Sequence, residues 1–154
     1  MLSDLSSIFF WWLSIFGLSL LSLPIIFYIF FKFWDRGYIF AKTLSLILIT
    51  YFALILGIFH ILPFTWWGIS TLIILFLAFD GLFLIRHHRY RDFFATFKRK
   101  YKIFIFEELV FLLILTAWSL VRGYTPDIEG LEKYMDWGFV NTALRSHFWP
   151  PQDM

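Results

Sequence analysis

The sequence predicts an all-α membrane protein with about four transmembrane helices, followed by a partly helical segment outside the membrane. Of its 154 residues, 60% are hydrophobic and only 16% are charged, and the mean hydropathy is +0.76. A soluble core of this size cannot hide so much apolar surface. The chain has no Cys, which excludes disulfides, thiolate metal sites and a Cys nucleophile, and its net charge of +2 gives no indication of a nucleic-acid partner.

The apolar residues form four runs, each about as long as the 20 residues that a helix needs to cross a bilayer. The first run is expected to stay as a helix, because its leader "MLSDLSS" contains Asp4 and no base, unlike a cleavable signal peptide. Pro63 in "LPFT" predicts a tight turn, so the second and third helices should form an antiparallel hairpin. The predicted helices cover residues 8–31, 38–61, 64–85 and 103–121.

The basic residues predict the orientation of these helices. The segment 86–102 has seven bases and the single acid Asp92, which places it in the cytoplasm. Counting helices from this loop puts the bases at 32, 36 and 42 on the same side, and the N-terminus, "LPFT" and everything after Val121 outside. We therefore expect a multi-pass protein of the cell membrane, with a transmembrane region at 1–121 and the start of an extracytoplasmic loop at 122–154.

The basic segment allows two interpretations. Its aromatic residues recur at helical spacing and could place an amphipathic helix on anionic lipid. We prefer the simpler interpretation, a topology signal with aromatic anchors, because such loops are common in membrane proteins. The adjacent His87 and His88 point about 100° apart on a helix, so they make a poor metal pair. The aromatic residues are Phe93, Phe94, Phe97 and Tyr101.

Three acids fall within the predicted spans, where a carboxylate costs on the order of 3 kcal/mol. Asp80 could pair with a base near the membrane surface or face a polar interior. At least one of Glu107 and Glu108 must lie within the fourth helix, because the apolar run after them is too short to span. They could form an interfacial pair neutralised by Lys100 or Lys102, which we prefer, or face the bundle interior. Since they point about 100° apart, we expect their surroundings to differ.

The segment after the fourth span predicts a short helix over residues 131–146, since it lacks Pro and is rich in helix formers. Glu132 and Asp136 are four residues apart and share one face of this helix. Such a carboxylate pair beside bases suits a site that handles a hydroxyl and an anionic group. Spacing alone favours an ordinary solvated helix with ion pairs. The polar residues expected on the neighbouring arc are Lys133, Asn141 and Arg145.

The stretch "EELVFLLILTAWSLVRGYTPDIEGLEKYMDWGFVNTALRSHFWPPQDM" resembles the start of the Chlor_Arch_YYY family of uncharacterised polytopic membrane proteins. This family normally continues with a Trp, glycines and a run of tyrosines, so the resemblance implies that the chain is an amino-terminal fragment. The fragment alone is then expected to be inactive. The matching positions are Arg122, Pro126, Ile128, Gly130, Glu132, Lys133, Met135, Asp136, Phe139, Asn141, Arg145, Ser146, Pro150, Pro151 and Asp153.

Members of that family are similar to GT-C membrane glycosyltransferases, which take a sugar from a polyprenyl-phosphate donor on the extracytoplasmic side. The resemblance implies that Asp136 is the catalytic base, with Glu132 as its rival or helper. The expected substrate-binding residues are Lys133, Arg122, Arg145 and Asn141. Expected partners are membrane lipids and the polyprenyl-phosphate sugar donor, without nucleic acid.

The sequence identifies no cofactor. Whether a divalent metal ion is required is left open, and no residue is assigned as a metal ligand.

Two other functions are compatible with the sequence. A non-catalytic assembly or scaffold protein would depend on Trp137, Phe139 and Trp149, whereas a transporter would use Asp80 and Glu107 within the bundle.

Overall fold

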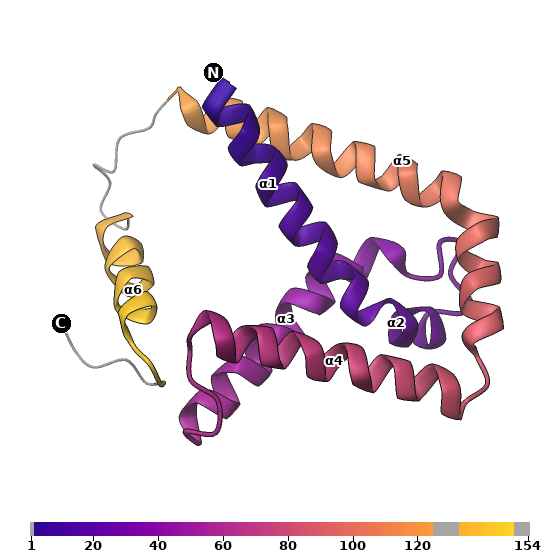
Figure 1. Cartoon of the computed structure of the whole chain (residues 1–154). Coiled ribbons are helices and arrows are strands. Elements are labelled where there is room, and N and C mark those ends of the chain that lie inside the picture. Colours follow the sequence, from indigo (N-terminus) through magenta and orange to yellow (C-terminus); the bar gives the residue numbers. More distant parts are fainter. Residues whose placement is uncertain (1, 125–132, 150–154) are drawn as a thin grey trace.

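Long helices make up almost all of the structure (Figure 1). The computed structural model describes residues 2–124 and 133–149, and no strand occurs among them. Four helical segments in this part are long and apolar enough to cross a membrane. The prediction of an all-α membrane protein with four spanning helices is therefore confirmed. The four segments are Leu5–Ile29, Tyr38–Ile58, Trp66–Arg86 and Tyr90–Gly123.

The first spanning segment is interrupted, although the sequence predicted one helix. Pro24 lies in the first turn of α2, where its missing N–H and its ring disfavour a continuous helix. The N–H of Leu23 donates to the carbonyl of Leu20, and the carbonyl of Ser19 accepts a bond of 3.3 Å from the Ser45 hydroxyl. A 3₁₀ turn and a serine from another helix therefore satisfy backbone groups at the break. The segment consists of α1 (Leu2–Ser19), η1 (Leu20–Ser22) and α2 (Leu23–Ile29).

The next two helices, α3 (Tyr38–Ile58) and α4 (Trp66–Arg86), lie within three residues of their predicted bounds. Buried Asp35 accepts the N–H groups of Gly37, at 3.0 Å, and Ile39, at 2.9 Å, at the start of α3. Gly37 has φ +81°, and a β-carbon there would lie 2.6 Å from Phe30, so this turn requires glycine. The apolar run had predicted the start of α3 at residue 38, and these two residues explain why the helix begins there.

Helix α5 (Tyr90–Gly123) differs most from the prediction. Residues 90–102 are helical rather than a loop, because no Pro or internal Gly stops the helix before Gly123. Its 34 residues correspond to about 51 Å, well beyond the roughly 30 Å of hydrocarbon. Figure 1 shows α5 changing direction along its length. The basic segment is thus the first part of a long, bent helix.

The connections gather at two ends of the bundle (Figure 1). At one end, which we call the α6 end, lie residues 59–65, the last turn of α5 and the short helix α6 (Lys133–Arg145). At the other, which we call the basic end, lie residues 30–37 and the connection from α4 to α5. Residues that the basic-residue pattern assigns to one side of the membrane thus share an end. That the α6 end is extracytoplasmic stays a prediction.

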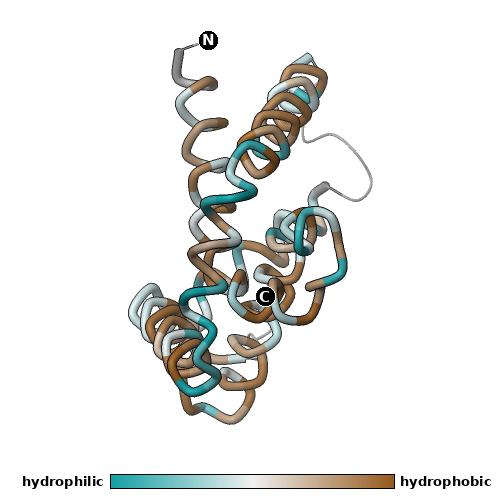
Figure 2. Tube along the Cα trace, turned by 90° about the vertical axis from the view of Figure 1, so that its right-hand side faces the viewer, coloured by the Kyte–Doolittle hydropathy of each residue, from teal (hydrophilic) through white to brown (hydrophobic). Residues whose placement is uncertain are grey.

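The buried core lies where α2, α3 and α5 meet. The ring of Phe104 stacks on Tyr38, at 4.3 Å between centroids, and on Phe27, at 5.6 Å. Many large apolar side chains of the spanning helices are exposed, and hydrophobic stretches recur along the trace (Figure 2), which is typical of helices surrounded by lipid or by other membrane helices. The core residues are Leu23, Ile26, Phe27, Tyr38, Ala41 and Phe104.

Candidate functional site

Most of the predicted site residues that the structure describes lie on α6. Asp136 is in the first turn of this helix and is exposed, and Arg145 is in its last turn and is also exposed. Glu132 lies outside the described residues, as does the side chain of Lys133. The predicted pair of Glu132 and Asp136 therefore stays a prediction.

The regular geometry of α6 corrects the expected arrangement of its polar residues. Asp136 and Arg145 are nine residues apart, which places them about 180° apart around the helix and about 13 Å apart along it. The Asn141 amide donates to the carbonyl of Trp137 at 2.8 Å, so it is already bonded within the helix. Arg145 therefore lies on the side of α6 opposite Asp136, and Asn141, five residues after Asp136, lies about 140° from it around the helix. Arg122 is exposed in the last turn of α5, on a different helix.

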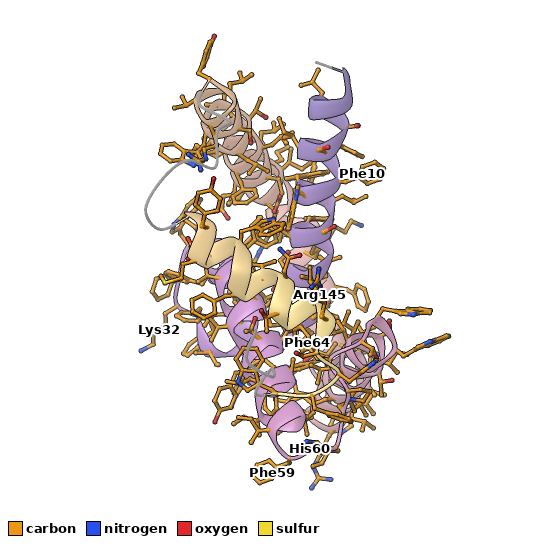
Figure 3. The ribbon with its side chains drawn as sticks, turned by 90° about the vertical axis from the view of Figure 1, so that its left-hand side faces the viewer. Phe10, Lys32, Phe59, His60, Phe64 and Arg145 are labelled. Atoms are coloured by element: carbon orange, nitrogen blue, oxygen red, sulfur yellow. The ribbon has the colours of Figure 1, made fainter. Side chains whose placement is uncertain are left out.

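The chain after α6 packs against the connection between α3 and α4, a contact that the sequence did not reveal. The N–H of Phe64 donates to the carbonyl of His147 at 2.6 Å, and the rings of His60 and Phe148 lie 4.7 Å apart. A β-carbon at Gly57 would lie 3.4 Å from the Cβ of Trp149. Figure 3, viewed onto the α6 end, shows α6 in front of the membrane helices, with Arg145 and Phe64 near each other. The position of the chain after α6 is thus fixed by residues before and after the turn between α3 and α4.

A second polar site lies between the helices and has Glu108 at its centre. Its carboxylate accepts from Trp12 Nε1 at 3.1 Å and from the Tyr38 hydroxyl at 2.7 Å, and it forms an ion pair with Lys42. The Lys42 ammonium also lies 4.8 Å from the centre of the Phe111 ring, within the range of a cation–π contact. We call Trp12, Tyr38, Lys42 and Glu108 the carboxylate cluster. It joins α1, α3 and α5.

The predicted partner of the glutamate pair was wrong. We expected Lys100 or Lys102 to neutralise it, whereas the partner of Glu108 is Lys42. The Lys100 ammonium instead donates to the carbonyl of Trp34, and Lys102 is exposed. Lys42 lies inside a spanning helix, where a base is unusual. Its position could therefore have indicated that its partner is an acid within another span.

Two other acids in the spanning helices lack such partners. Both carboxylate oxygens of Glu107 and of Asp80 are buried and have no hydrogen-bond partner among the described residues. Only 4% of the Asp80 surface is exposed, which supports an interior position over pairing with a surface base. Glu107 and Glu108 thus have different surroundings, as their positions on the helix predict.

The two sites differ in the chemistry that they can perform. In the carboxylate cluster, Glu108 accepts from three donors, one of which is the positively charged Lys42. Glu108 therefore stabilises contacts between helices and is not a free base. Asp136 is exposed, so a substrate at the α6 end could reach it. The described residues contain no group of three or more His, Cys, Asp or Glu that could hold a metal ion.

A comparison of the sequence with known families gives one match. The family described as "Uncharacterized membrane protein (DUF2298)" matches residues 48–154, which is 107 of the 154 residues. No curated protein and no solved structure matches the chain. The match begins within α3 and includes the carboxylates of α5 and α6. The chain therefore belongs to the DUF2298 family of membrane proteins.

Proposed function

We propose that this member of the DUF2298 family is a membrane glycosyltransferase-like protein of the GT-C type. It would transfer a sugar from a polyprenyl-phosphate donor on the extracytoplasmic side of the cell membrane. The Chlor_Arch_YYY and GT-C resemblance of the segment from Glu107 onward supports this function. The observation that carries the proposal is the exposed Asp136 on α6, at the end of the bundle that the basic residues assign to the outside.

In this proposal Asp136 acts as the general base. Sugar transfer to a hydroxyl requires a base within hydrogen-bond reach of the attacking oxygen, and an exposed carboxylate at the membrane surface meets that need. Glu132, one turn before Asp136 in the sequence, would assist it.

The geometry of α6 ranks the proposed phosphate-binding residues. Lys133 is three residues before Asp136, which corresponds to about 4.5 Å along the helix and a neighbouring position around it. Arg145 is on the opposite side of α6, so it would bind a different part of the donor. Arg122, on α5, could meet a donor that lies between the two helices, and Asn141 would serve only after releasing its bond to Trp137.

The test is Asp136→Asn in the full-length protein, followed by an assay of sugar transfer from a polyprenyl-phosphate donor in membranes. The substitution keeps the size of the side chain and removes the base. We expect transfer to fall by roughly 100-fold or more, the usual contribution of a general base. Tyr134→Phe, on the same exposed turn, is the matched control and should keep full transfer. Full turnover of folded Asp136→Asn would refute the assignment.

A second candidate function is a non-catalytic assembly protein. It is favoured by the exposed Trp137 and Phe139, which are 60% and 63% accessible on α6 and could contact a partner. Trp149 packs over Gly57 within the chain, so it is less available to a partner than we expected. The same assay separates the two functions, because a scaffold transfers no sugar with or without Asp136.

A further inference from the structure

A cavity of about 330 Å³ lies at the basic end, away from α6. Four chain segments line it: α2, the turn before α3, the last turn of α4, and the first turns of α5 with Arg89 just before them. Its charged residues are Arg36, Arg89, Arg99 and Asp92. We call this space the arginine cavity. The arrangement depends on residues 90–102 being helical, because this helix brings Asp92 and Arg99 to the same wall.

The arginine cavity has an excess of positive charge. Three guanidinium groups face one carboxylate, and the only ion pair among the described residues joins Lys42 to Glu108 elsewhere. None of the three arginines therefore has a carboxylate partner within the described chain. Three arginines that share a single carboxylate leave an excess of positive charge, which is expected to attract an anion, and phosphate is the anion whose geometry suits two-pronged guanidinium contacts.

The side chain of one of these arginines is held by a neighbour before any ligand binds. The guanidinium carbon of Arg89 lies 4.6 Å from the centre of the Tyr28 ring, a cation–π contact. For Arg36 the backbone is fixed, in a tight turn with φ +61° directly after the buried Asp35 that caps α3. The contact with Tyr28 reduces the freedom that Arg89 loses on binding, so this part of the cavity is preorganised for a ligand.

The remaining wall of the cavity is apolar and indicates the kind of anion. Phe27 and Tyr28 of α2 line the space beside the arginines. Bases at the start of a long helix that then crosses the membrane lie at the depth of lipid headgroups. A ligand with a phosphate and an adjoining apolar part matches both walls, whereas a free ion would use only one.

We propose that the arginine cavity binds the phosphate of an anionic phospholipid from the leaflet at the basic end. Arg36 and Arg99 contact the phosphate oxygens, and Arg89, oriented by Tyr28, closes the site. The aromatic residues of α2 contact the upper part of the acyl chains. The three arginines disfavour a zwitterionic headgroup, because its quaternary ammonium is repelled by them. This proposal is independent of the proposed sugar transfer.

The test is a lipid titration of the whole purified chain in detergent, followed by native mass spectrometry. The probes are phosphatidylglycerol, phosphatidylcholine and inorganic phosphate. The cavity variant is Arg36→Gln with Arg99→Gln. Its matched control is Lys98→Gln with Lys102→Gln, which removes two charges from exposed positions on the same part of α5 outside the cavity.

We expect one tightly retained phosphatidylglycerol, bound at least about tenfold more weakly by the cavity variant and nearly unchanged by the control. Equal weakening in both variants would mean general charge attraction and would overturn the proposal. So would equal retention of phosphatidylcholine, or displacement of the lipid by millimolar inorganic phosphate. If the cavity variant does not fold, Arg99→Lys gives the same comparison against Lys98→Arg, because lysine keeps the charge but loses the two-pronged contact.

Discussion

Replacing Glu108 by glutamine should destabilise the helix bundle more than the same change at its neighbour Glu107. Glutamine keeps the shape of the side chain but has one oxygen, so it can accept from Trp12 or from Tyr38 and not from both, because these two donors bond to different oxygens of Glu108. It removes the negative charge opposite Lys42, whose side chain is only 12% exposed. Glu107→Gln removes a charge for which the described residues offer no hydrogen bond.

The structure sets the size of the effect. Hydrogen bonds between membrane helices contribute about 0.6 kcal/mol each, so loss of all three contacts to Glu108 would cost about 2 kcal/mol. Leaving one charge of a buried pair uncompensated costs about 3–5 kcal/mol in other proteins. Because Lys42 keeps its contact with the Phe111 ring and a small exposed area, we expect a loss of about 2–4 kcal/mol in the free energy of unfolding.

The assay is unfolding in mixed micelles with increasing dodecyl sulfate, followed by tryptophan fluorescence. Glu107→Gln is the matched control and should change the free energy of unfolding by less than about 1 kcal/mol, as is usual where no partner is lost. Combining Glu108→Gln with Lys42→Met should recover most of the loss, since no charge then remains unpaired. Equal losses at Glu107 and Glu108, or a double variant as unstable as Glu108→Gln alone, would refute the reasoning.

Two further predictions concern the α6 end. The chain has no cysteine, so a cysteine placed at Ser146 should react with a membrane-impermeant thiol reagent applied to intact cells; reaction only after lysis would contradict the orientation. Gly57→Val should release the segment after α6 and raise that labelling rate severalfold, because a β-carbon there already lies 3.4 Å from Trp149 and a branched side chain needs more room. Gly57→Ala is the control and should label at the original rate, whereas an unchanged rate for valine would show that this contact does not hold the segment.

Hydropathy and local signals in the sequence predicted most of the fold. The predicted bounds of α3 and α4 were close to the observed ones, because Pro63 and the apolar runs determine locally where a helix begins and ends. The interruption at Pro24 was also readable, since a proline inside an apolar run disfavours an unbroken helix, yet the run was treated as one helix. For α5, the helical spacing of the aromatics in residues 90–102 indicated a helix, but the many charges there led us to prefer a loop.

The contacts between helices were beyond local reasoning. Lys42 was counted as a loop base because it is near the end of a span, but its position on α3 places it opposite Glu108. Trp149 packs over Gly57, which is far away in the sequence, and neither residue type predicts which residue it will contact. The helix α6 was correctly predicted from its helix formers and the lack of Pro. The site on it was predicted from the family resemblance and the spacing of its acids, and it stays a prediction.

The chain after α6 is held by the end of α3, a helix that the carboxylate cluster joins to α5. Its bond runs from Phe64, in the connection after α3, to the carbonyl of His147. Glu108 of α5 contacts both Tyr38 and Lys42 of α3. Loss of these contacts would allow α3 to shift against α5 and to carry the connection that holds the chain after α6. We therefore expect Glu108→Gln to affect the placement of α6 as well as the stability of the bundle.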